Sequence, residues 1–353
     1  MEAKLNIPEL LLRPAFCVED GRITRLNREA AGYMIAEGTP IRELIATGQE
    51  DYEAFTGGML CLTLQIGDHP MAATVVPHED EQLFILEQDA QDAQLQSMPL
   101  VAQELRGPLT GIIAAAERLL PSASAQDAQS AAQMNRRIYQ MLRIVNNMSD
   151  AARFAARQPI QEYVDAVALL DEIMDKVIPL AEHSGYTLRF SGPMQPIYTL
   201  ADRELLERAV YNLLSNAMKF SPQGSVIDAK LLRSGNTLRF TIEDAGCGID
   251  ADVSGSVFSR YLRSPALEDP SHGLGLGMVM VRLAATQHGG TVLIDHPHEI
   301  GTRVTMTMAI RQTQNASVRT PIMHIDYAGE RDHALIELAD ILPAELYKPE
   351  WID

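Results

Sequence analysis

The sequence predicts an α+β protein of several units: an N-terminal α/β unit, a hairpin of two helices and a C-terminal α/β unit. Strand-like runs separated by turn residues fill much of residues 59–87, a pattern typical of an antiparallel meander. Apolar residues recur at spacings of three and four in residues 105–119 and again in 134–148, which indicates two amphipathic helices. Residues 206–219 have the same period, with apolar and polar residues on different faces. The length of 353 residues leaves room for about two or three domains.

Residues 1–90 are expected to form the first unit. Two short strands are predicted around a turn at Asp20 and Gly21, and helical pieces are expected from Asn27 onward. The strands of the meander are expected at residues 59–66, 71–76 and 82–87. This order of elements, with the opening turn and Asn27, resembles a PAS sensor domain, and the resemblance implies an α/β sensor fold.

Residues 91–157 are expected to hold a helical linker and two antiparallel dimerisation helices. The apolar seam consists of Leu105, Leu109, Ile112, Ala116 and Leu119 on the first helix and Met134, Ile138, Met141, Val145 and Met148 on the second. A lone hairpin would leave this seam exposed, so we expect two copies to pair through residues 98–157 as a four-helix bundle. The alternative is a hairpin that packs on a neighbouring domain of the same chain.

Residues 103–110 read QELRGPLT. They resemble the phosphoacceptor box of sensor histidine kinases, in which a His precedes Glu-Leu-Arg, and Gln103 stands at the position of that His. A neutral imidazole has a free lone pair that attacks a phosphoryl group, whereas the lone pair of an amide nitrogen is delocalised. Glu104 matches the family's proton acceptor but has no imidazole to assist.

Two further features of these helices weaken the usual chemistry. Gly107 replaces the Thr or Asn with which the family orients water to dephosphorylate a response regulator. The sequence has no histidine between His78 and His183, which excludes a shifted acceptor on either helix. We therefore expect autophosphorylation at the usual site, in cis or in trans, and phosphatase activity to be impaired.

Residues 162–310 are expected to form an ATP-binding unit. Residues 212–221 read NLLSNAMKFS and resemble the N box of the α/β-sandwich ATPase fold shared by histidine kinases, gyrase and Hsp90. The resemblance implies that Asn216 coordinates Mg²⁺, which prefers oxygen ligands, and that Lys219 offsets phosphate charge. Asn212 occupies the place where hydrolysing relatives carry a general-base Glu, and its amide cannot act as a base. Rapid ATP hydrolysis is therefore not expected.

Glycine-rich turns follow in the order that the same fold shows. Residues 244–249 (DAGCGI) resemble the first glycine box, in which Asp244 would accept a hydrogen bond from the adenine amino group. Residues 257–263 resemble the aromatic box, residues 271–277 (SHGLGLG) resemble the second glycine box, and residues 301–304 (GTRV) match the closing segment. The helix after the second box offers amide donors to phosphates. The further residues that the resemblance assigns to the nucleotide are Gly246, Gly248, Gly273, Gly275 and Thr302.

The chain is acidic, with 47 Asp and Glu against 29 Lys and Arg and a net charge of -18, which disfavours nucleic acid and anionic lipid as partners. Three scattered cysteines, Cys17, Cys61 and Cys247, form no disulfide or zinc pattern. His69 and His78 are expected in turns, as solvated residues rather than haem ligands. No apolar stretch approaches the roughly 20 residues that span a bilayer, and the start lacks the features of a signal peptide, so the expected location is the cytoplasm.

Residues 311–353 lie beyond the expected end of the ATP-binding fold. They predict a linker followed by an amphipathic helix over residues 333–347, whose apolar positions are Leu335, Ile336, Leu338, Ile341, Leu342 and Leu346. Such a helix either covers the ATP-binding unit or docks a partner, and the sequence favours neither role.

These resemblances predict a two-component protein of the histidine-kinase type that binds Mg·ATP, forms a homodimer and acts as a regulatory pseudokinase. Its expected partner is a response regulator or an active histidine kinase. One alternative is an active protein kinase that phosphorylates a partner or another residue. A second alternative is an ATP-fold regulator resembling anti-sigma serine kinases, which the dimerisation helices argue against because those proteins lack them.

Overall fold

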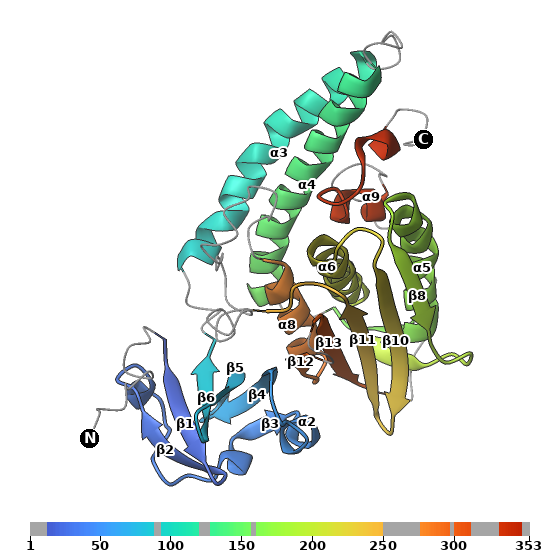
Figure 1. Ribbon diagram of the computed structural model, residues 1–353. Helices are drawn as coiled ribbons and strands as arrows, with labels where there is room; N and C mark the ends of the chain where they lie inside the picture. Colours follow the sequence, from blue (N-terminus) through green and yellow to red (C-terminus); the bar gives the residue numbers. More distant parts are fainter. Residues whose placement is uncertain are drawn as a thin grey trace.

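The computed structural model describes residues 13–87, 93–119, 128–156, 160–249, 276–296, 300–311 and 332–347. An N-terminal β-rich domain and a C-terminal α/β domain lie side by side, and a long helical hairpin rises from them (Figure 1). The hairpin contacts the α/β domain through its second helix, and a short C-terminal segment packs beside that contact (Figure 1).

The N-terminal domain is an antiparallel sheet in the order β2-β1-β6-β5-β4, with β3 paired to β4. Its strands are β1 (Ala15–Glu19), β2 (Arg22–Leu26), β3 (Ile45–Thr47), β4 (Met59–Ile66), β5 (His69–His78) and β6 (Glu81–Leu86), and its helical pieces are η1 (Ala30–Gly32), η2 (Ile41–Glu43) and α2 (Gln49–Glu53). Phe16 and Phe84 stack within its core, with their ring centroids 5.0 Å apart. The predicted turn at Asp20 and Gly21 is present, and both residues have positive φ, as a two-residue hairpin requires.

Two local expectations for this domain were wrong. His69 and His78 begin and end β5, paired with Ile66 and Glu81, because β5 is longer at both ends than its apolar run suggests. The helix expected from Asn27 is reduced to the single turn η1. The Asn27 side chain is buried, and its Oδ1 accepts hydrogen bonds from the backbone N–H groups of Ala15 and Ala30. Asn27 thus ties the end of β2 to β1 rather than starting a long helix.

The helical hairpin consists of α3 (Ala93–Leu119) and α4 (Ala128–Ala156), and the predicted break at Pro121 lies outside the described residues. The predicted seam divides into two faces. Leu109, Ala116, Ile138 and Val145 are buried, whereas Leu105, Ile112, Met134 and Met141 are exposed. Ile144, which the predicted seam did not include, is exposed as well. The first set holds the helices of this hairpin together, and the second leaves an apolar stripe uncovered in the single chain.

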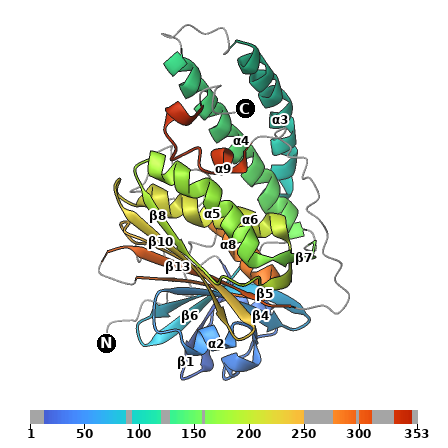
Figure 2. The same ribbon diagram turned by 90° about the vertical axis from the view of Figure 1, so that its right-hand side faces the viewer.

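The C-terminal α/β domain is a sheet in the order β12-β13-β11-β10-β8, with helices α5, α6 and α8 on one face (Figure 2). Neighbouring strands are antiparallel except β10 and β8, which are parallel. The elements are β7 (Glu162–Asp165), α5 (Ala166–His183), β8 (Thr187–Ser191), β9 (Tyr198–Ala201), α6 (Arg203–Phe220), β10 (Val226–Ser234), β11 (Thr237–Asp244), α8 (Gly277–Gln287), β12 (Val292–Asp295) and β13 (Thr302–Ala309); β7 pairs with β9. Leu206, Val210, Leu213 and Ala217 of α6 are buried, as the helical period predicts.

The C-terminal segment is not the single amphipathic helix that the sequence predicts. It forms a short helix α9 (His333–Glu337), a turn, and the 3-10 helix η7 (Ala344–Tyr347), because Pro343 interrupts the helical pattern. Leu335, Ile336, Leu338, Leu342 and Leu346 are buried nonetheless, and Ile341 is partly buried. Tyr347 packs edge-on against Tyr139 of α4 with ring centroids 5.0 Å apart. Among the described residues, no helix is long and apolar enough to cross a membrane.

Candidate nucleotide site and acceptor position

Helix α6 carries the polar residues of the predicted N box, and it begins where Asp202 caps it by accepting a hydrogen bond from the Leu205 N–H at 3.2 Å. Asn212 is buried, and its Nδ2 donates to the Arg208 carbonyl oxygen at 2.8 Å. A Cβ at Gly277 would lie 2.7 Å from the Asn212 Oδ1, so the start of α8 approaches the Asn212 side chain of α6 more closely than a larger residue allows without a shift of that side chain. Asn212 therefore sits at a close approach of the two helices.

Asp244 is held at the end of β11 by two backbone donors. Its Oδ1 accepts hydrogen bonds from the N–H of Gly246 at 2.8 Å and from the N–H of Thr302 at 3.2 Å. Burial raises the pKa of the Asp244 carboxyl, and these two N–H groups act against that rise. Because Oδ1 is occupied from two sides, Oδ2 is the atom available to a ligand such as the adenine amino group.

The loop after Asp244 passes close to the end of α6. A Cβ at Gly246 would lie 2.8 Å from the Phe220 carbonyl oxygen, and a Cβ at Gly301 would overlap the Asp244 carbonyl oxygen. Gly248 has a φ of 78°, in the left-handed region that favours glycine. The structure thus brings the first glycine box, Thr302 and the C-terminal end of α6 together.

Some predicted site residues can be placed and others cannot. Asn216 and Lys219 are half-buried on α6, one and two turns beyond Asn212. Gly273, Gly275 and residues 257–263 lie outside the described residues, so their roles stay predictions from the sequence. Among the described residues, no group of three or more His, Cys, Asp or Glu side chains is arranged to hold a metal ion. A Mg²⁺ ion would therefore depend on Asn216 and on phosphate oxygens, a donor set that suits this cation.

Gln103 and Glu104 lie on α3, and both are exposed. Helix α4 stands between α3 and the α/β domain in both views (Figures 1 and 2). The acceptor position is therefore open to solvent, on the helix of the hairpin that α4 separates from the α/β domain.

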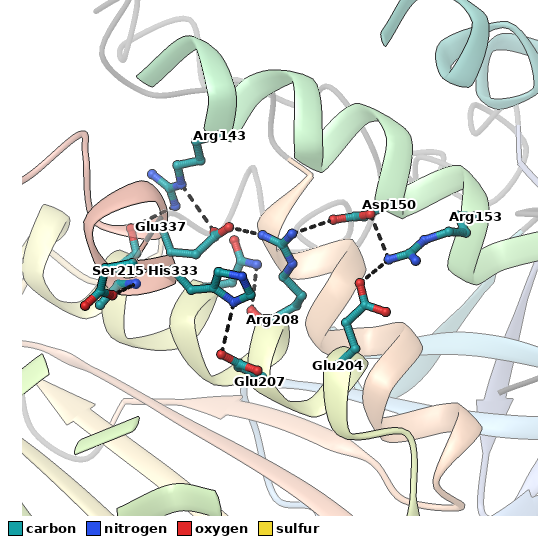
Figure 3. Close-up of polar contacts among 12 residues, drawn as sticks. Arg143, Asp150, Arg153, Glu204, Glu207, Arg208, Ser215, His333 and Glu337 are labelled. Atoms are coloured by element: carbon teal, nitrogen blue, oxygen red, sulfur yellow. Dashed lines mark hydrogen bonds and ion pairs between the residues drawn. The ribbon is translucent and has the colours of Figure 1, made fainter. Parts of the chain in front are cut away.

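A buried charge network, which the sequence did not reveal, joins α4, α6 and the C-terminal segment (Figure 3). Arg208 of α6 pairs with Glu337 of α9 and, at 3.0 Å, with Asp150 of α4. Arg143 of α4 donates to the Ser215 Oγ at 2.9 Å and faces Glu337 at 3.7 Å. The partners come from segments far apart in the chain, so no spacing pattern could have indicated them.

His288 is a second buried polar residue whose contacts sequence reasoning missed. Its Nε2 accepts a hydrogen bond from the Asp202 backbone N–H at 2.8 Å, and its Nδ1 lies 2.6 Å from the Ala284 carbonyl oxygen. The first contact requires an unprotonated Nε2, so Nδ1 carries the proton and the ring is neutral. His288 thereby links the end of α8 to the start of α6.

Acidification is expected to destabilise the α/β domain through His288, because burial lowers the pKa of this ring below its usual value near 6.5. In the unfolded chain the ring takes up a proton as the pH falls through about 6.5, while the folded chain resists it. The contribution of His288 to the free energy of unfolding is therefore fully present above that pH. Below it, the free energy of unfolding falls by up to about 1.4 kcal/mol per pH unit. Urea denaturation at pH 7.5 and 5.5 measures this loss, which His288→Gln should reduce and the exposed control His183→Gln should not. Equal losses in both variants would contradict the assignment.

Comparison with known proteins agrees with this geometry. Residues 201–312 match the family model of histidine kinase-, DNA gyrase B- and HSP90-like ATPases, and residues 94–157 match the His kinase A (phospho-acceptor) domain. The first match covers the fold that carries Asn216, Asp244 and Thr302, and the second covers the helical hairpin. The fold and site define an ATPase of this class joined to a phospho-acceptor hairpin. With both domains in this order, the chain is similar to the sensor histidine kinases.

Individual relatives are similar over part of their length. The sensor protein KdpD of Clostridium acetobutylicum is 28% identical over 200 residues, which are 54% of this chain and 22% of the relative. The sensor-like histidine kinase SenX3 of Mycobacterium tuberculosis is 29% identical over 218 residues, which are 60% of this chain and 52% of the relative. The chain thus spans about half or less of these relatives. The crystal structure of full-length ShkA in complex with AMPPNP shares the fold, with a TM-score of 0.51, 21% identity, and coverage of 70% of this chain and 54% of that chain.

Proposed function

We propose that this chain is an ATP-binding regulatory member of the sensor histidine kinase family that does not phosphorylate itself at the usual position. The proposal is carried by two observations: the Asp244 carboxylate is held by the backbone N–H groups of Gly246 and Thr302, and Gln103 stands on α3 where the family resemblance expects the acceptor His. The family match at residues 94–157 supports the correspondence of that helix. A chain with this combination would signal by conformation or through a partner.

In the proposed nucleotide site, different residues bind the adenine and the Mg²⁺ ion. Asp244 would accept a hydrogen bond from the adenine amino group, with Gly246, Gly248 and Thr302 shaping the backbone around the base. Asn216 would coordinate Mg²⁺, and Lys219 would offset phosphate charge, with Gly273 and Gly275 expected near the phosphates. Buried Asn212 provides no general base, so we propose slow turnover or none.

Asn216→Ala and Asp244→Ala are each expected to weaken Mg·ATP binding at least about tenfold, or about 1.4 kcal/mol, because each removes a polar contact to the nucleotide or its cation. Isothermal titration calorimetry on the full chain measures the affinities. The matched controls are Asn236→Ala and Asp175→Ala, two exposed positions of the same domain, which should bind as the unmodified chain does. Unchanged affinity in both site variants would refute the site.

We also propose that the chain is a homodimer through residues 98–157. The exposed stripe of Leu105, Ile112, Met134, Met141 and Ile144 supports this. If two hairpins pair through this stripe, these apolar side chains are removed from water. The stripe follows the spacing of a helical bundle, with Ile112 seven residues after Leu105 and Met141 seven after Met134.

The double variant Ile112→Glu with Met141→Glu is expected to be a monomer at tens of micromolar, because it places charges in the apolar stripe, whereas the unmodified chain should be a dimer. Light scattering gives both masses. Gln133→Glu, an exposed polar position on α4, is the control and should remain a dimer. A monomeric unmodified chain would contradict the proposal.

The N-terminal β-rich domain is proposed to be a PAS-like sensor. Its five-strand order, its opening hairpin and the position of Asn27 support this assignment. The partner is proposed to be a response regulator or an active histidine kinase. Incubation of the chain with γ-labelled ATP, alone and with such a partner, tests whether any phosphoryl group is transferred.

A further inference from the structure

The N-terminal domain and the α/β domain share one continuous sheet in the described residues. Strand β4 of the N-terminal domain pairs antiparallel with β12 of the α/β domain, with Cys61, Leu60 and Met59 opposite Val292, Leu293 and Ile294. Without this pairing, β12 would present an unpaired edge of backbone donors and acceptors. Figure 1 shows β4 and β12 where the two domains meet, and Figure 2 shows the strands of the two domains next to one another. We refer to this pairing of residues 59–61 with 292–294 as the strand joint.

Two glycines of the N-terminal domain let the strand joint close. Gly58 has a φ of 84°, and a Cβ there would overlap the Ile294 carbonyl oxygen and lie 3.1 Å from the Asp295 Cα. Gly48 has a φ of 89°, and a Cβ there would overlap the Thr291 side chain. By contrast, Gly38 has a φ of 83°, but a Cβ there would meet no atom within 4 Å. Glycine at positions 48 and 58 is therefore favoured for two reasons. The positive φ favours it, and the absence of a Cβ leaves room for β12 and the residue before it.

A charged residue of the N-terminal domain fastens the same contact. The Asp51 carboxylate accepts hydrogen bonds from the Arg239 guanidinium of β11 and from the Thr291 hydroxyl just before β12, both at 2.5 Å. Asp51 is largely buried by these contacts, with 12% of its side chain exposed. A charge-assisted bond in such a place is stronger than one at an open surface. The strand joint is thus fixed by backbone pairing and by a specific carboxylate.

The strand joint ends close to the candidate adenine site. Asp295 follows directly after the paired residues and holds the Arg303 guanidinium through two hydrogen bonds, at 2.8 and 3.1 Å. Arg303 adjoins Thr302, whose backbone N–H donates to Asp244. Three consecutive contacts therefore lead from Gly58 to the carboxylate that would receive adenine.

We propose that the N-terminal domain acts on the nucleotide site directly through the strand joint, in addition to any signal that passes along α3. An intact joint holds Asp295 and Arg303 in place, and thereby holds the Thr302 N–H on Asp244 in the arrangement that accepts adenine. Because coupling between two sites is reciprocal, nucleotide binding in turn strengthens the joint. This inference rests on the proposed nucleotide binding, but the existence of the joint does not.

The test compares Gly58→Ala with Gly38→Ala in the full chain. Both variants place an alanine at nearly the same positive φ, and only Gly58→Ala introduces an overlap with β12. Hydrogen exchange of the β12 amides reports on the joint without nucleotide. Calorimetric titration with Mg²⁺ and a non-hydrolysable ATP analogue reports on the site.

Gly58→Ala is expected to speed exchange in β12 about tenfold or more and to weaken analogue binding about fivefold, while Gly38→Ala changes neither. Asp51→Asn should act in the same direction as Gly58→Ala, without any change of backbone. Unchanged exchange in Gly58→Ala would overturn the joint. Faster exchange with unchanged affinity would overturn the coupling, and failure of the unmodified chain to bind the analogue would overturn the proposed function and the coupling together.

Discussion

Glu337→Gln is expected to lower the free energy of unfolding by about 3 kcal/mol, because it removes the negative charge between two buried arginines. Glu337 is 1% exposed and lies between Arg208 of α6 and Arg143 of α4 (Figure 3). Burial alone lowers the pKa of Arg208, but Glu337 and Asp150 outweigh this and raise it, so the guanidinium stays charged and needs its partners. Removing one member of a buried ion pair leaves the other uncompensated.

The loss of stability in Glu337→Gln is expected to appear first as local opening of the C-terminal segment, residues 332–347. Besides Glu337, that segment is held by Asp340, which pairs with Arg143 at 2.5 Å, and by the Tyr347 carbonyl oxygen, which accepts from Asn135 at 3.0 Å. These bonds persist in the variant, but they connect the segment only to α4. His333 and Glu207 also pair the segment with α6, but this pair is more exposed than the one that the variant loses.

Urea denaturation of the full chain measures the loss of stability, and hydrogen exchange in residues 332–347 locates it. The matched control is Glu345→Gln, which makes the same chemical change at an exposed position of the same segment and should stay within about 0.5 kcal/mol of the unmodified chain. Equal free energies of unfolding in Glu337→Gln and Glu345→Gln would show that the charge network around Glu337 does not stabilise the fold.

Continuous apolar runs and helical periodicity predicted several elements of this fold. Strands β4 and β6 coincide with apolar runs whose residues are mostly buried, and helix α6 follows the 3.6-residue period of its apolar residues. The failures have specific causes. Pro343 divides the C-terminal helix, and Asn27 uses its side chain to cap a strand end rather than a long helix. In both places a single residue overrides a regional pattern.

Motif order predicted which residues meet around Asp244, because the hydrogen bonds from Gly246 and Thr302 are local to the glycine box and its neighbouring strand. The contacts between units could not be predicted in this way. Gly58 looks like an ordinary turn glycine in the sequence, and only the approach of β12 gives it a second role. Arg143 looks like a solvated residue on a helical surface, yet it is buried by a segment almost 200 residues later.

The unmodified chain is expected to form no acid-labile phosphohistidine on residues 98–157 when incubated with Mg·ATP. Gln103 offers only an amide, and neither α3 nor α4 contains a histidine. Gln103→His is expected to restore labelling there, because the new imidazole has a pKa near neutrality and stands beside Glu104, the family's proton acceptor. Position 103 is exposed, so the substitution should leave the packing of α3 unchanged.

Labelling with γ-labelled ATP, followed by acid treatment and peptide mapping, measures both outcomes. Gln103→Asn is the matched control, since it changes the side chain without supplying an imidazole, and it should stay unlabelled. Adding Asp244→Ala to Gln103→His should strongly reduce the restored label at limiting ATP, because transfer requires the nucleotide site on the α/β domain. Acid-labile label on residues 98–157 of the unmodified chain would contradict the proposal that Gln103 prevents autophosphorylation.

A Gln103→His variant that binds Mg·ATP but remains unlabelled would show that autophosphorylation is blocked by more than the missing acceptor. The position of α4 between α3 and the α/β domain, held by Arg143, Glu337 and Arg208, then becomes the physical obstacle to test by combining Gln103→His with Glu337→Gln.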